Sequence, residues 1–127
     1  MDKEPAILVK GVSKAFEQGG EILHVLRDIH FQAHPGELVM VVGPSGSGKT
    51  TLLSAIAGTL RLENGTIHLF DFPLHLKSSR EIVAFRRQNV GFIFQQFHLI
   101  PTLTCGENVA IPLLLNGYAY ERALKEA

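Results

Sequence analysis

A glycine-rich segment limits most strongly what this chain can fold into. Residues 43–50 read Gly-Pro-Ser-Gly-Ser-Gly-Lys-Thr and match the pattern G-x-x-x-x-G-K-[ST]. The continuous apolar run at residues 38–42 predicts a strand buried on both faces, as in a parallel sheet. Residues 49–57 then predict a helix that stops at Gly58. A strand, a glycine-rich loop and a helix in this order are typical of a phosphate-binding loop.

The residue types of this loop suit the recognition of phosphate. Phosphate oxygens need several converging backbone N–H groups, and glycine lets the backbone approach closely. The N-terminus of the following helix directs a partial positive charge at the same anion. We therefore expect one set of adjacent residues to bind the phosphates of a nucleotide, namely Gly43, Ser45, Gly46, Ser47, Gly48, Lys49, Thr50 and Thr51.

Three side chains of this set have separate expected roles. Lys49 can reach the β- and γ-phosphates and is the first candidate catalytic residue, and the Thr50 hydroxyl can ligate Mg²⁺. Thr51 can donate to the α-phosphate. A Rossmann dinucleotide site fits less well, because Gly46-x-Gly48 would require glycine or alanine where Thr51 stands.

Composition excludes several other classes of protein. The 127 residues carry 12 basic and 12 acidic side chains, so net charge gives no sign of a nucleic-acid partner. The single cysteine, Cys105, cannot form an internal disulfide. No apolar stretch approaches the roughly 20 residues that span a bilayer, and the start lacks the layout of a secretory signal. We expect a cytoplasmic protein that reaches a membrane only through a partner.

Patterns elsewhere in the chain predict the remaining elements. Further strands are expected at residues 6–16, 22–33, 66–70 and 90–94. Turns are expected at residues 18–21, at residues 34–36 and at Asn64-Gly65. Helices are expected from the capping box at Ser78 and Glu81 to about Gln88, from the capping box at Thr104 and Glu107 with an interruption near Pro112, and at residues 118–127.

The position of the loop in the chain separates families of phosphate-loop proteins. In small phosphate-loop kinases the loop usually follows the first strand, whereas here 42 residues precede Gly43 and read as a β-hairpin. This arrangement resembles the nucleotide-binding domain of ABC transporters, in which an antiparallel β-subdomain precedes the phosphate loop. In that family an upstream aromatic residue stacks on the adenine of ATP. The resemblance implies this role for Phe16.

A second segment resembles the same family. Residues 90–101, Val-Gly-Phe-Ile-Phe-Gln-Gln-Phe-His-Leu-Ile-Pro, look like the ABC Q-loop. The resemblance implies that Gln95 is catalytic, contacts Mg²⁺ or the attacking water, and links the nucleotide site to a transmembrane permease subunit. It also implies that this permease docks between Phe97 and Leu103. Residues 19–21, 26–29 and 107–113 are similar to LolD/MacB-type ATPases, which move lipoproteins, lipids or drugs.

The expected fold is α/β, a P-loop NTPase core with an N-terminal antiparallel β-subdomain, truncated at the C-terminus. Residues 1–127 would form one partial nucleotide-binding domain, since they contain no signature motif, Walker B motif or switch histidine. Residues 67–71 imitate a Walker B strand, but Phe72-Pro73 follows where a glutamate is needed, so they predict a hairpin strand. Because the family completes each site with a second domain, a homodimer or heterodimer is implied, and no turnover is expected from these residues alone.

The expected function is that of an ATP-binding subunit of an ABC transporter. When full length and dimeric, it would bind Mg²⁺ and ATP and hydrolyse ATP to drive transport or lipid and lipoprotein extraction. It would lie on the cytoplasmic face of the cell (inner) membrane, held there by its permease. A non-hydrolysing nucleotide-binding module and a P-loop kinase fragment are the alternatives. The upstream hairpin and the Q-loop count against the kinase.

Overall fold

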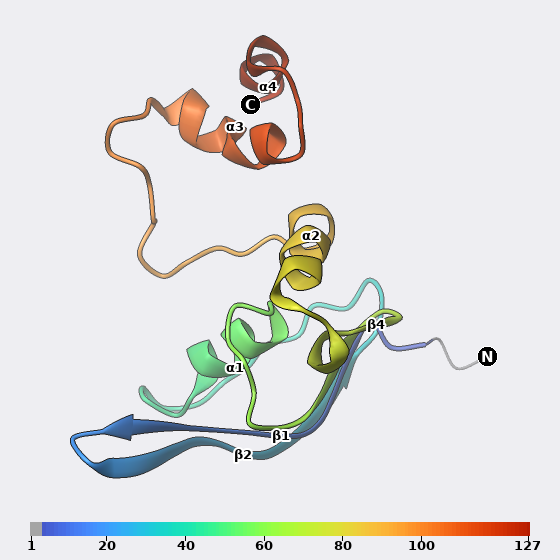
Figure 1. The fold of residues 1–127 in the computed structure, drawn as a ribbon, viewed down its shortest axis with the longest axis vertical. Helices are drawn as coiled ribbons and strands as arrows, with labels where there is room; N and C mark the ends of the chain where they lie inside the picture. The colour runs from blue at the N-terminus through green and yellow to red at the C-terminus, as the bar shows by residue number, and fades with distance from the viewer. Residues whose placement is uncertain (1–3) are drawn as a thin grey trace. The chain divides into compact units, whose positions relative to one another are not determined.

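The chain folds into two compact units. The computed structural model describes residues 4–127, and the division between the units falls at residues 82 and 83. The first unit contains a sheet and one α-helix, and the second contains helices and a long irregular segment (Figure 1). Among the described residues, no helix is both long enough and apolar enough to cross a membrane.

A four-stranded antiparallel sheet dominates the first unit. Its strands are β1 (Ile7–Gln18), β2 (Glu21–Ala33), β3 (Asn64–Leu69) and β4 (Phe72–Pro73), in the spatial order β2-β1-β3-β4. Gly19 and Gly20 form the two-residue turn between β1 and β2, both with positive φ angles, so the predicted hairpin is confirmed. The pairing of β3 with β4 likewise confirms that residues 67–71 belong to a hairpin and not to a Walker B strand.

The core of this unit lies between the sheet and helix α1 (Lys49–Ile56), which covers one of its faces (Figure 1). Val9 and Val12 of β1 and Ile67 of β3 are its largest fully buried side chains. Helix α1 contributes Leu52 and Ala55 to the buried set. Burial of each larger apolar side chain stabilises a fold by roughly 1.5–3 kcal/mol, so this layer holds the sheet and the helix together.

The turn predicted at Asn64-Gly65 is wrong. These two residues begin β3, where Gly65 has a φ of 91°. A Cβ atom at Gly65 would lie 2.5 Å from the carbonyl oxygen of Gly11 in β1. The positive φ that an Asn-Gly pair favours is therefore present, but it serves the close approach of two strands and not a chain reversal.

The strands predicted at residues 38–42 and 90–94 are also wrong. Both segments are irregular in the structure, and Ile93 is 99% exposed. A strand exists only where a neighbouring strand completes its backbone hydrogen bonds, and no described strand pairs with either segment. The apolar pattern of both segments predicted that they would be buried. Neither segment is buried within the part of the chain that the structure describes.

The helices after the sheet follow their predicted starts closely. A 3-10 turn, η1 (Leu74–Leu76), precedes α2 (Ser79–Asn89), and the division between the two units falls within this helix. The second unit continues with α3 (Cys105–Leu115) and α4 (Tyr120–Glu126). Thr104 and Glu107 form a complete capping box at the start of α3, as predicted.

The predicted interruption at Pro112 is wrong, because α3 runs through it. Proline donates no N–H to the helix and its ring crowds the preceding turn, but the next turn remains bonded. The backbone N–H of Asn116 donates to the Pro112 carbonyl at 3.2 Å, and the Asn116 side-chain amide donates to the same oxygen at 2.9 Å. These two bonds hold the end of the helix after the proline.

Candidate nucleotide site

The glycine-rich loop is fixed against strand β2 by a contact that only glycine permits. Gly48 has a φ of 92°, and a Cβ atom there would lie 2.9 Å from both the carbonyl oxygen and the Cγ1 atom of Val25. Real Cβ atoms do not approach other atoms so closely, and side chains rarely adopt this φ. A side chain at position 48 would thus push the loop away from the hairpin. Ser47 closes the loop by donating its backbone N–H to the Pro44 carbonyl at 3.2 Å.

The start of helix α1 is suited to an anion. Gly48 is the residue that precedes the helix, and it has no side chain to cap the free N–H groups. The first helical hydrogen bond joins the Leu52 N–H to the Gly48 carbonyl at 2.9 Å. The N–H groups of Lys49, Thr50 and Thr51 therefore precede the helical ladder, and the first turn contains no acidic side chain to bind them.

The Lys49 ammonium group lies over the loop. Its Nζ atom donates to the carbonyls of Gly43 and Pro44, at 2.8 and 2.7 Å, and to the Ser47 hydroxyl at 3.2 Å. These bonds join the two ends of the loop and place a positive charge beside it. A phosphate group bound by the loop amides would meet this charge directly.

The structure brings the predicted phosphate ligands together in one continuous loop and helix start. That set is Gly43, Ser45, Gly46, Ser47, Gly48, Lys49, Thr50 and Thr51. Thr50 is exposed in the first turn of α1. Its hydroxyl oxygen is a ligand type that suits the predicted role in holding Mg²⁺, because Mg²⁺ prefers oxygen ligands. Phosphate oxygens and water molecules would supply the remaining ligands. No group of three or more His, Cys, Asp or Glu side chains in residues 4–127 could form a metal site by itself.

Phe16 lies on the same hairpin that supports the loop. It pairs with Leu23 across β1 and β2, close to the part of β2 that Gly48 contacts. Phe16 is 40% exposed, so the ring is not part of the hydrophobic core. An exposed aromatic face on this hairpin is compatible with the stacking role that the family resemblance implies.

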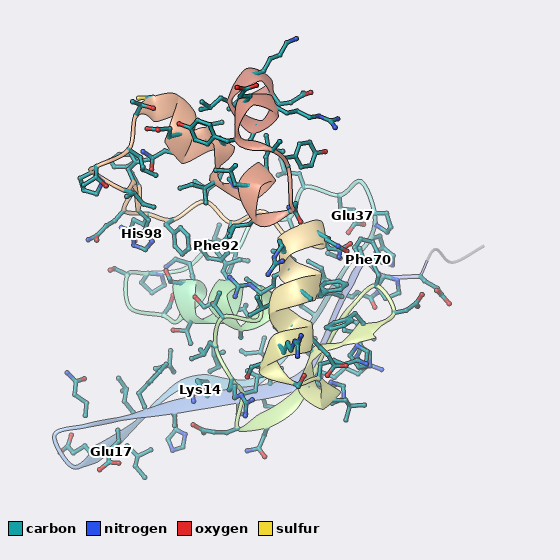
Figure 2. All side chains as sticks on the ribbon, turned by 45° about the horizontal axis from the view of Figure 1, so that its top comes forward. Lys14, Glu17, Glu37, Phe70, Phe92 and His98 are labelled. Atoms are coloured by element: carbon teal, nitrogen blue, oxygen red, sulfur yellow. The ribbon has the colours of Figure 1, made fainter. Side chains whose placement is uncertain are left out.

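Gln95 belongs to the second unit, and its surroundings are described within that unit. Gln95 and Gln96 form an exposed bend in the irregular segment after α2. Aromatic rings flank this bend, with 4.7 Å between the centroids of Phe92 and Phe94 and 4.2 Å between those of Phe94 and His98. Figure 2 shows Phe92 and His98 in the same segment. The catalytic and metal-binding roles of Gln95 stay predictions.

An apolar groove follows this bend. Phe97 is 86% exposed, Leu99 and Ile100 are exposed as well, and Leu103 is partly buried. Leu99, Ile100 and Leu103 line a groove of about 400 Å³, which the first turn of α3 completes. The expected exposure of apolar side chains between Phe97 and Leu103 is thus present for most of them.

Asn108 shapes this groove, and the sequence analysis missed it. Its side-chain oxygen accepts from the Ile100 N–H at 2.8 Å. Its side-chain nitrogen donates to the carbonyls of Ile100, Leu103 and Thr104 at 3.0–3.2 Å. An asparagine in the first turn of a helix can form hydrogen bonds with neighbouring backbone groups. This tendency was the only feature of the sequence that could have indicated a role for Asn108.

Comparison with known proteins decides the family. A sequence model of the ABC transporter family matches residues 26–127. The chain belongs to this family. The lipoprotein-releasing system ATP-binding protein LolD 1 of Rhodopirellula baltica is 45% identical over 87% of this chain and 48% of its own length. The macrolide export ATP-binding/permease protein MacB of Agrobacterium fabrum is 37% identical over 90% of this chain and 18% of its own length.

A solved structure confirms the expected α/β fold class. The dimeric structure of the ABC transporter cassette MJ0796 matches this chain with a TM-score of 0.88 and 35% identity. The match covers 94% of this chain and 53% of the cassette. The chain spans about half the length of LolD 1 and of this cassette.

The geometry of the loop makes Lys49 the most direct side chain to test. Charge-assisted hydrogen bonds contribute about 1.5–3 kcal/mol each, so Lys49→Ala in the full-length protein should weaken MgATP binding roughly 10- to 150-fold. Calorimetric titration at fixed salt and Mg²⁺ measures this. Lys10→Ala, on the exposed side of β1, is the matched control and should bind as the wild type does. Equal affinities for Lys49→Ala and wild type would disprove the assignment.

Proposed function

We propose that this chain is part of the nucleotide-binding domain of an ABC transporter and binds ATP. The loop is the observation that carries the proposal, because its free amides and the Lys49 ammonium converge where a triphosphate would bind. Phe16 would stack on the adenine from the adjacent hairpin. Base and phosphates would therefore be recognised by one hairpin and the loop that contacts it.

We propose that hydrolysis in the whole protein uses Lys49, Thr50 and Gln95. Lys49 would stabilise charge on the β- and γ-phosphates, and Gln95 would orient the attacking water. The Thr50 hydroxyl and Gln95 would hold Mg²⁺, which neutralises phosphate charge when bound. A carboxylate base and the signature motif of a second domain would complete the site, so the active form would be a homodimer or heterodimer of such domains.

Because the proposed hydrolysis needs a carboxylate base and a second domain's signature motif, we predict that residues 1–127 alone release no phosphate above background when supplied with MgATP. They contribute phosphate positioning but no Walker B glutamate. A phosphate-release assay measures the rate, and the full-length protein in the same assay is the positive control. Turnover by residues 1–127 that Lys49→Ala abolishes would show that the missing motifs are dispensable.

The exposed apolar segment from Phe97 to Leu103 supports a docking role. Exposed apolar clusters commonly mark partner surfaces. We propose that a short cytoplasmic helix of a transmembrane permease subunit binds the groove beside Leu99 and Ile100. The protein would thus be peripheral on the cytoplasmic face of the cell (inner) membrane. By analogy with the relatives named for lipoprotein release and macrolide export, the whole protein would drive transport or lipid and lipoprotein extraction.

A charged side chain in this groove should uncouple the subunit from its permease. Leu99→Glu in the reconstituted transporter should lower permease-stimulated ATPase activity about 10-fold or more, because an unpaired carboxylate buried in an apolar contact strongly disfavours binding. ATP affinity should not change. Leu76→Glu, at an exposed position in η1, is the matched control and should remain coupled.

Two results would count against this docking site. Leu99→Glu could stimulate as fully as the wild type, which would exclude the groove as the permease contact. Alternatively, its ATP affinity could fall in parallel with its ATPase activity, which would indicate damage to the nucleotide site and not to coupling.

A further inference from the structure

We infer that Glu63 and Lys14 are positioning residues that fix the ring of Phe16 for stacking on a nucleobase. The inference deepens the proposed ATP site and rests on it. Neither residue belongs to the phosphate loop, and neither was predicted from the sequence. All three residues lie in the first unit, where the structure gives their mutual contacts.

Glu63 joins the segment before β3 to strand β1. Its carboxylate accepts the backbone N–H of Ala15 at 3.2 Å through Oε2 and at 3.3 Å through Oε1. The same carboxylate accepts the Lys14 ammonium through Oε1 at 3.2 Å. The β1–β2 pairing shifts register between Lys14 and Ala15, so this bond fixes the backbone where the ladder is irregular. Phe16 is the next residue along the strand.

The charge on Glu63 is favoured by these contacts. The Lys14 side-chain hydrogen bond, followed by the Ala15 backbone bond, holds the pKa of the Glu63 carboxyl below its usual value. The carboxylate is exposed, so the pair contributes little to global stability. Its effect is geometric: it restrains the long, flexible side chain of Lys14, which is only 16% exposed.

Lys14 in turn restrains Phe16. Its Nζ atom lies over the Phe16 ring, 5.2 Å from the ring centroid. One face of the ring is therefore covered by an ammonium group, and a nucleobase can stack only on the other face. Figure 2 shows Lys14 on the hairpin, with Glu17 nearer to the tip. Glu17 offers a matched control, since it is an exposed glutamate on the same strand.

The experiment compares two ligands that differ only in the nucleoside, MgATP and magnesium tripolyphosphate, on the full-length protein. Phe16→Ala should weaken ATP binding about 5- to 150-fold, as expected for the loss of one stacked base. Glu63→Ala and Lys14→Met should each weaken ATP binding about 3- to 10-fold, a part of that effect. Tripolyphosphate affinity should stay within about twofold of wild type in every variant, because the phosphate loop is untouched.

Two further variants show whether Glu63 acts through the ring. Added to Phe16→Ala, the Glu63→Ala change should cause no additional loss of ATP affinity, because the positioned group is already absent. Glu63→Gln should retain part of the wild-type affinity, since its amide oxygen can still accept the Ala15 N–H. Glu17→Ala should bind both ligands as the wild type does.

The possible failures are distinguishable. Unchanged ATP affinity in Phe16→Ala would overturn the base site and with it that part of the proposed function. A loss in Phe16→Ala but not in Glu63→Ala or Lys14→Met would overturn only the positioning inference. Equal losses for ATP and tripolyphosphate in Glu63→Ala would assign Glu63 a general structural role, which also overturns it. If Glu63→Ala does not fold, Lys14→Met and Glu63→Gln decide by the same criteria.

Discussion

The contact between the Gly48 backbone and strand β2 is the constraint on which the nucleotide site depends. Because a Cβ atom would lie 2.9 Å from Val25, only glycine lets the loop rest on the hairpin. This contact involves the residue directly before α1, where the first amides of the helix have no side-chain cap. It also links the loop to the strand pair that carries Phe16. Backbone packing therefore places the loop against the hairpin, and no charged side chain is needed for this contact.

Single polar side chains then fix the irregular segments around this framework. Lys49 binds two carbonyls of its own loop, Glu63 binds the backbone at Ala15, and Asn108 binds three residues around the apolar groove. Exposed hydrogen bonds and ion pairs of this kind contribute modestly to folding stability. Their main effect is to restrict loops whose backbones form no strand-to-strand hydrogen bonds. Such loops border both proposed binding surfaces.

The sequence predicted what local interactions determine. The glycine turn between β1 and β2, the start of α1 after the glycine-rich segment and the capping box at Thr104 were all predictable, since neighbouring residues specify each of them. The strands at residues 38–42 and 90–94 were not, because apolar runs do not show whether a pairing strand is present. The bonds of Glu63 to Lys14 and Ala15 join residues nearly 50 positions apart, and no local pattern encodes them.

Amide chemical-shift mapping of the full-length, isotopically labelled protein tests most directly whether phosphates and base bind these two adjoining regions. Both MgATP and magnesium tripolyphosphate should shift the amide signals of residues 46–51, where the free N–H groups of the loop and α1 lie. Only MgATP should also shift residues 15–17, beside the Phe16 ring. If saturating MgATP left residues 46–51 unperturbed, the glycine-rich loop would not be the phosphate site.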